Sequence, residues 1–446
     1  MRSTFYLDRK QKPETAKAQI FFAAASFFEG MVISFLTIFL NECRKQLDWT
    51  SKMSSLSLFL PPFGAAIGIF ICSFFVSHQK SNLKIMRGLI CGSFLSILVF
   101  SLLGIFLPTG LNSAGEIIKK GEYYTLFALF VLFSSILMGL HWAFLSFHAS
   151  CAADINFAEG SRYGHICLYG VLMPAIASPL AGFIAESYFI GYKGYLFLFL
   201  VSCPLLILLF GLTFIFKPFP SSLYHSDSDE HVPTKLLFQN KNYVFYLFLA
   251  SLWIPLIWAS DSLTSSLWSS YESLTETLNS FNPLTWGIYL GVSYLFEFLF
   301  VFINTHFGIG KKIRFSLSLA LGLICIETLS FGLFSYFFVG PEHVSILLAV
   351  GIILIHSLKG MASGLYVTSN LGMLNHILGP KLRRKAVFIA PLIFQLVNSV
   401  LQLCYPYFTD VTFIVFFVMS GIAFVGLVLS TFLDVHLLHH PEEMKD

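Results

Sequence analysis

Four ionisable side chains lie inside long apolar stretches of this 446-residue sequence, where a charge is costly. They are Glu29, Glu297, Glu327 and Lys359. At the centre of a membrane-spanning helix a charge costs about 2.5–3.5 kcal/mol on insertion scales, so each of the four invites a functional explanation. A buried carboxyl group can take up and release a proton, and a lysine can bind an anion or pair with an acid.

Uncharged polar side chains form two further patterns in these stretches. Gln395, Asn398 and Gln402 have i, i+3, i+7 spacing and make one stripe on a helix, which could hydrogen-bond a sugar, nucleoside or amino acid, or hold two helices together. His141 and His148 lie seven residues apart and share one face, so they could relay protons, although packing is the commoner use of such histidines. Spacing alone leaves both patterns open.

Tryptophans gather around one of the apolar stretches. Trp253 and Trp258 flank Pro255 and are candidates for stacking on the ring of a solute. Trp268 and Trp286 lie near the ends of apolar stretches, where we expect them in the aromatic belt at the membrane surface.

The composition excludes a water-soluble globule. Hydrophobic residues make up 56% of the chain and charged residues only 11%, against roughly 25% in soluble domains, and the mean hydropathy is +0.76. The net charge of +3 gives no reason to expect nucleic-acid binding, and the eight cysteines lack CxxC spacing. Because the sequence shows no nucleophile–base set, phosphate-binding loop or metal cluster, we expect neither an enzyme nor a cofactor.

Apolar runs of about 20 residues cross the ~30 Å hydrocarbon core as helices, because lipid offers the backbone no other hydrogen-bond partner. Twelve such runs are predicted, at 18–41, 53–77, 84–107, 123–148, 164–187, 193–217, 241–261, 284–304, 313–339, 343–370, 386–407 and 410–434. The polar segment 218–240 is the predicted linker between two six-helix bundles, 1–217 and 241–446. Two such halves are typical of transporters, whose substrate site lies between them.

Basic residues divide unevenly between the two sides of the predicted membrane. Twenty of the 27 Lys and Arg residues fall in the terminal segments and the loops on the N-terminal side, six fall on the other side, and Lys359 falls within a span. Since cytoplasmic loops carry the excess of positive charge, both termini are predicted to be cytoplasmic.

Three motifs make the chain resemble the major facilitator superfamily. Its members carry the loop G-x-x-x-D-R-x-G-R-R after helix two and again after helix eight, and here these copies correspond to FVSHQKSNLK at 75–84 and to NTHFGIGKKIR. A third match, EGSRYGHICLYGVLMPAIASPLAG, opens the fifth span. The matching residues are Lys80, Lys84, Glu159, Arg162, Gly308, Lys311, Lys312 and Arg314. The resemblance implies that Arg162, Gly308, Lys311 and Lys312 belong to loops that gate a transport cycle.

In that family helices one, four, seven and ten line a central cavity. The resemblance therefore favours Glu29, on the first span, as the proton-coupling acid, with a structural lock to a hydroxyl or arginine as the alternative. Lys359 on the tenth span is expected to pair with Glu297 of the neighbouring eighth span, or to bind an anionic substrate. Glu327 falls on the ninth, a lipid-facing helix, where a protonated acid or a packing contact is expected.

The favoured function is a secondary active transporter that moves a small organic solute by alternating access with proton symport, as a monomer in the bacterial cytoplasmic membrane. The expected substrate-binding residues are His141, Trp253, Trp258, Lys359, Gln395, Asn398 and Gln402. Two alternatives stay open: a transport-inactive membrane scaffold with a transporter fold, and proton-driven drug efflux. The identity of the solute does not follow from the sequence.

Overall fold

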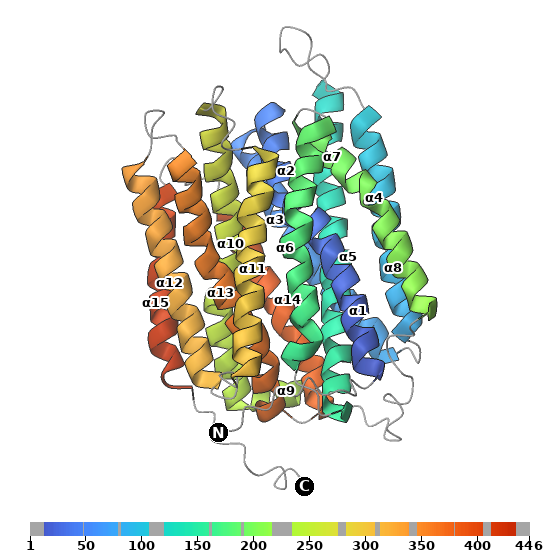
Figure 1. Cartoon of the computed structure of the whole chain (residues 1–446), viewed down its shortest axis with the longest axis vertical. Coiled ribbons are helices and arrows are strands. Elements are labelled where there is room, and N and C mark those ends of the chain that lie inside the picture. The colour runs from blue at the N-terminus through green and yellow to red at the C-terminus, as the bar shows by residue number, and fades with distance from the viewer. Residues whose placement is uncertain are drawn as a thin grey trace.

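Long, roughly parallel helices stand side by side in the computed structural model, as Figure 1 shows. Every element in the described residues is helical. The structure describes residues 13–47, 49–78, 82–106, 120–159, 163–188, 191–215, 234–274, 282–307, 313–338, 346–378, 380–404 and 412–433.

The N half of the chain, residues 13–215, provides the first six spans. Its helical elements are α1 (Pro13–Phe28), η1 (Glu29–Ile33), α2 (Ser34–Gln46), α3 (Ser51–His78), α4 (Asn82–Phe106), α5 (Lys120–Glu159), α6 (Tyr163–Tyr188), α7 (Tyr192–Val201) and α8 (Cys203–Ile215). The continuous run α1–η1–α2 forms the first span, and α7 with α8 forms the sixth. Pro204 accounts for the break between α7 and α8, because a proline has no N–H to donate and is tolerated in the first turn of a helix.

The C half, residues 234–433, provides the other six spans. Its elements are α9 (Lys235–Gln239), α10 (Lys241–Leu274), α11 (Pro283–His306), α12 (Ile313–Phe337), α13 (Ile346–Ile377), α14 (Pro380–Cys404) and α15 (Thr412–Ser430). A capping box begins α11: the Asn282 side chain accepts from the Thr285 backbone N–H at 2.8 Å, and the Thr285 hydroxyl accepts from the Asn282 N–H at 2.9 Å.

The predicted number of spans is confirmed, since twelve helices in the described residues are long and apolar enough to cross a membrane. The largest difference concerns the seventh, which was expected to end at residue 261. Instead α10 continues to Leu274, because Leu263 and Leu267 repeat at helical spacing and bury their side chains.

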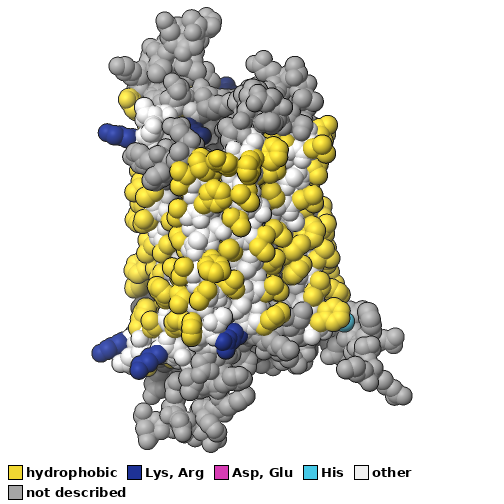
Figure 2. Space-filling model, turned by 90° about the vertical axis from the view of Figure 1, so that its left-hand side faces the viewer, with side chains coloured by type: hydrophobic (Ala, Val, Ile, Leu, Met, Phe, Trp, Pro, Cys, Tyr) yellow, Lys and Arg dark blue, Asp and Glu magenta, His cyan; other side chains and the backbone are white. Residues whose placement is uncertain are grey.

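The outer surface is apolar, as lipid requires. Figure 2 shows a broad band of hydrophobic side chains across the middle of one face, with Lys and Arg side chains at its upper and lower margins. Leu347 is 82% exposed and Phe70 63% exposed. A soluble monomer rarely exposes so continuous an apolar surface, so the protein is a multi-pass integral membrane protein.

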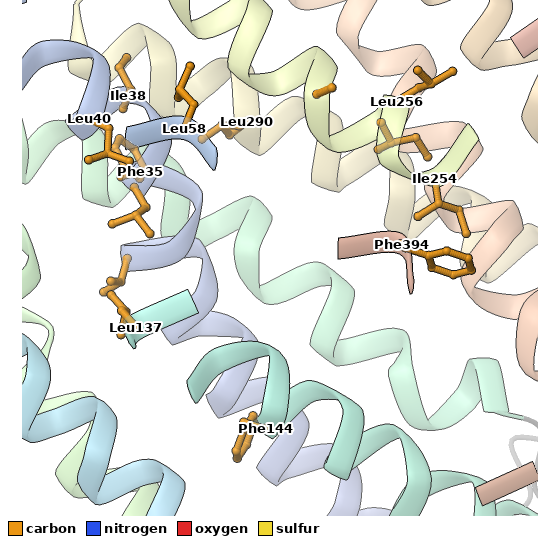
Figure 3. Packing of buried hydrophobic residues seen from close by; sticks show 14 of the residues in the cluster. Phe35, Ile38, Leu40, Leu58, Leu137, Phe144, Ile254, Leu256, Leu290 and Phe394 are labelled. Atoms are coloured by element: carbon orange, nitrogen blue, oxygen red, sulfur yellow. The ribbon is translucent and has the colours of Figure 1, made fainter. Parts of the chain in front are cut away.

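The two halves meet through closely packed helices, α6 along α11 and α3 along α14. Gly287 of α11 makes this approach possible, because a Cβ atom added there would lie 2.3 Å from the Ser178 carbonyl oxygen of α6. Buried apolar side chains from both halves fill the interior. Figure 3 shows some of them: Phe35, Leu40 and Leu58 from the N half, and Ile254, Leu290 and Phe394 from the C half.

Candidate functional site

A cavity of about 460 Å³ lies between the two halves, within the range of small-molecule sites. Side chains from both halves line it. The predicted site residues among them are Glu29, His141, Trp258, Glu297, Lys359, Gln395, Asn398 and Gln402. Trp253 is different: it is fully buried behind the cavity-lining Tyr366, with the two ring centroids 5.0 Å apart and the rings perpendicular.

Glu29 begins a π-helical turn in the middle of the first span. The turn, η1, interrupts the α-helical hydrogen bonding between α1 and α2, and the Ser34 N–H donates to the Glu29 carbonyl oxygen five residues back. Next to Glu29, Gly30 packs against Pro174 of α6, whose Cα would lie 2.8 Å from an added Cβ. Single π turns of this kind occur frequently at functional sites.

The Glu29 carboxylate lies beside a histidine of α5. His141 Nε2 is 3.7 Å from Glu29 Oε1, the His141 side chain is 5% exposed, and that of Glu29 is 25% exposed. One turn along the helix the Ser34 hydroxyl shares a hydrogen bond of 2.8 Å with the Tyr294 hydroxyl of the C half. Glu29 therefore faces the cavity with a titratable neighbour, close to a polar contact between the halves.

Lys359 of α13 pairs with Asp261 of α10, in a direct contact between Nζ and Oδ1. The predicted ion pair to Glu297 is therefore wrong as a direct contact. The reason lies in Gly360, where an added Cβ would be 1.9 Å from the Ser293 carbonyl oxygen of α11. Because successive residues are about 100° apart around a helix, pressing Gly360 against α11 directs Lys359 elsewhere. The described residues offer the Glu297 carboxylate no ion-pair or hydrogen-bond partner, and it lines the cavity.

Behind Lys359 and Asp261 the charged groups continue into the interior of the C half. His356 Nε2 lies 3.7 Å from Asp261 Oδ1, and His356 Nδ1 lies 3.2 Å from Glu327 Oε1 of α12. The ring of Tyr289 stacks on the imidazole with centroids 3.9 Å apart. Glu327 is completely buried, so on the ninth span its side chain points inward and makes a contact between helices.

The polar stripe of α14 links two helices and also faces the cavity. Gln402 donates to the Ser262 hydroxyl of α10 at 2.7 Å and to Asn398 Oδ1 at 3.4 Å, and so links two helices. The buried Oε1 atoms of Gln395 and Gln402 have no hydrogen-bond partner among the described residues, although both side chains line the cavity. A buried carbonyl oxygen without a donor is costly, so both are suited to accept a hydrogen bond from a solute.

Trp268 and Trp286 do not form a membrane belt, so that expectation is wrong. Each is 1% exposed, and their ring centroids lie 5.6 Å apart. Trp286 also stacks on Tyr289 at 4.6 Å. The cause is the length of α10, which carries Trp268 past the predicted end of its span into contact with the first turn of α11.

Among the lining residues that sequence reasoning missed are Asp261, His356 and Trp142. Asp261 was read as the last residue of a span, and the continuation of α10 was not foreseen. His356 could have been found from its i, i+3 spacing to Lys359, which puts both on one face. Trp142 packs on Trp258 across the two halves, with ring centroids 4.7 Å apart, and no sequence signal joins them.

The predicted gating-loop residues Arg162, Gly308, Lys311 and Lys312 lie outside the described residues. The helix before the second loop is described. There Asn304 is buried and donates to the Thr368 hydroxyl of α13. It also accepts from the Ser316 hydroxyl of α12 at 3.5 Å, so this side chain ties three helices together.

No protein-family model matches the sequence, and no curated protein matches it. Solved structures do. The nucleoside transporter NupG matches with a TM-score of 0.65 and 11% identity over 94% of this chain and 98% of its own. The xylose transporter XylE from E. coli matches with a TM-score of 0.62 and 12% identity over 93% and 96%. A D-xylose-proton symporter matches with a TM-score of 0.60 and 15% identity over 94% and 95%.

These likenesses cover nearly the whole chain and show its fold. The protein has the fold of the major facilitator superfamily transporters, as the motifs in its sequence led us to expect. The structures that it resembles are those of transporters, not of enzymes. At 11–15% identity the likeness establishes the fold, and it does not carry over a solute.

Proposed function

We propose that the protein is a secondary active transporter that moves a small organic solute by alternating access, coupled to proton symport. The observation that carries the proposal is the 460 Å³ cavity between the two halves, with acidic side chains facing it. A site at the interface of two repeats can be exposed to either side of a membrane when the halves rock against each other. A membrane scaffold would have no need for such acids in its interior.

The lining favours an uncharged or cationic solute that carries a ring. Asp261 neutralises Lys359, so the remaining charges that face the cavity are the acids Glu29 and Glu297. Trp258 offers an aromatic face, and Gln395 offers a hydrogen-bond acceptor. NupG, which shares the fold, is a nucleoside transporter, and we therefore propose nucleosides as the substrate class, ahead of sugars.

Glu29 is the proposed coupling acid. It lies in the middle of the first span, it is partly exposed to the cavity, and His141 lies 3.7 Å from its carboxylate. An acid with this access can exchange protons with the water in the cavity, and its charge changes when it does so. Solute binding and the movement of the halves then respond to the proton that it carries.

Uptake into proteoliposomes tests both the proposed substrate class and the proposed coupling acid. With an acidic exterior, the wild-type protein should accumulate labelled uridine or adenosine uphill. Glu29→Gln mimics the protonated acid, so it should abolish uphill accumulation and keep the exchange of labelled for unlabelled nucleoside. Glu186→Gln, which changes an exposed acid that accepts a hydrogen bond from Asn282, is the matched control and should behave as wild type.

Two results would count against the proposal. Uphill accumulation by Glu29→Gln at the wild-type rate would remove Glu29 as the coupling acid. If uridine, adenosine and xylose all fail both to enter the vesicles and to shift the melting temperature, nucleosides and sugars are not the solutes, and the scaffold alternative gains.

We further propose that the protein works as a monomer in the bacterial cytoplasmic membrane with both termini in the cytoplasm. The support is the excess of basic residues on the N-terminal side. In a variant whose native cysteines are replaced by serine, Ser228→Cys should react with an impermeant maleimide only from the cytoplasm, and Ser273→Cys only from outside. Labelling of both from the same side would show that the topology is wrong.

A further inference from the structure

Four titratable side chains lie one after another from the cavity into the interior of the C half. Lys359 contacts Asp261, Asp261 lies 3.7 Å from His356, and His356 lies 3.2 Å from Glu327. The exposed fraction of the side chain falls along the series, from 28% at Asp261 to 1% at His356 and zero at Glu327. The proposed coupling through Glu29 makes no use of the last two groups.

The charges of this series fix how many protons it holds. With Lys359 positive and Asp261 negative, one proton shared by His356 and Glu327 leaves the four groups neutral overall. Without that proton a carboxylate with no exposed surface would carry an uncompensated charge, which is strongly disfavoured in an apolar interior. The series therefore stores one proton as long as Lys359 stays on Asp261.

The other titratable groups that face His356 do not change this proton count. The helices packed against it present Asp261 from α10, Tyr289 from α11 and Glu327 from α12, and Lys359 lies one turn along α13 itself. Tyr289 covers the face of the ring. His356 lines the cavity, but its Nε2 atom is buried with Asp261 beside it, so the Glu327 carboxyl group reaches the cavity through the imidazole and Asp261.

We propose that Asp261, His356 and Glu327 form a second proton-binding centre, loaded and emptied through Asp261 and controlled by Lys359. When Lys359 releases Asp261 but stays beside the group, the Glu327 carboxyl group gives its proton to His356 Nδ1, the proton on His356 Nε2 passes to an Asp261 oxygen, and the charge of Lys359 then balances the Glu327 carboxylate. The imidazole stays neutral and exchanges one tautomer for the other, so the number of protons is conserved. The inference rests on the proposed proton coupling and extends it to the C half.

Infrared difference spectra between mildly acidic and mildly alkaline buffer test the centre without any solute. The wild-type protein in lipid should show a pH-dependent C=O band of a buried carboxylic acid. Glu327→Gln should remove this band, and Glu186→Gln should leave it in place. An unchanged band in Glu327→Gln would overturn the proposal, even if Glu29→Gln abolishes uphill uptake as expected.

Asp261→Asn supplies a second test, should Glu327→Gln fail to fold. This variant keeps the buried carboxyl group and His356 but removes the acid that connects them with the cavity. Lys359 can then balance an ionised Glu327 carboxylate, so the Glu327 band should be lost and should no longer change with pH. A band that still responds as in wild type would refute the route through Asp261. Because both measurements omit solute, failure of the transport proposal alone would leave them unaffected.

Discussion

In the described residues, the first and fourth spans of each half bring an acid and a histidine together. In the N half these are Glu29 and His141, and in the C half they are Asp261 and His356; the atoms of each pair approach to 3.7 Å. The surroundings differ. Glu29 has His141 as its ionisable neighbour, whereas Asp261 also contacts Lys359, and His356 also contacts Glu327. The fold thus presents one open acid and one acid whose charge is balanced.

The two acids also lie at different depths. The Asn41 side chain donates to the Ser265 hydroxyl at 2.6 Å, which marks a common level of the first and seventh spans. Glu29 lies twelve residues from Asn41, and Asp261 lies four residues from Ser265. At 1.5 Å per residue Glu29 is about 12 Å farther from that level. Two similar acid–histidine pairs can therefore act at different depths of one cavity. Glu29 is open to the cavity, whereas Lys359 balances the charge of Asp261.

The largest expected effect comes from removing the charge that balances the C half. Lys359→Met leaves Asp261 and Glu327 without their cation, and stranding a buried charge typically costs about 3–5 kcal/mol, so the melting temperature in detergent should fall steeply. Asp261→Asn in the same background should restore part of the loss, because it removes the stranded partner. Glu297→Gln in that background should not, and if it rescues better than Asp261→Asn, the assigned pairing is wrong.

A comparison of the two histidines should give a smaller effect. His356→Asn leaves Glu327 without its hydrogen-bond partner and removes the ring that stacks on Tyr289, so we expect a loss of about 1–3 kcal/mol. His141→Asn affects an acid that is 25% exposed and can be hydrated, so its melting temperature should stay closer to wild type. Equal losses of stability at both positions would contradict the difference in burial between the two pairs.

The smallest effect concerns the surface that both halves share. Gly287→Ala places a Cβ atom against the Ser178 carbonyl oxygen and should lower the melting temperature, since overpacking costs about 1–3 kcal/mol. Gly322→Ala is the matched control, because no atom lies within 4 Å of an added Cβ there. It should be neutral or stabilising by up to about 1 kcal/mol. A stabilising Gly287→Ala would show that α6 and α11 lie farther apart than described.

The spans were predictable because each is a local property. A run of about 20 apolar residues must be helical in lipid, whatever its neighbours are, and all twelve were found in this way. The acids Glu29 and Glu297 were noticed for the same reason, as charges within such runs. The end of α10 was misjudged because buried leucines, which only packing reveals, continue the helix through the polar residues after Asp261.

The sequence by itself determined the helical membrane fold, the number of spans and the positions of most charged groups along them, because hydropathy and charge act residue by residue. Only the tertiary structure decided which charges meet. Lys359 lies 98 positions from Asp261, and Glu327 lies 29 from His356. Their contacts follow from the packing of α10, α12 and α13, and at Gly360 the close approach to α11 turns Lys359 away from the acid that its position along the chain had suggested.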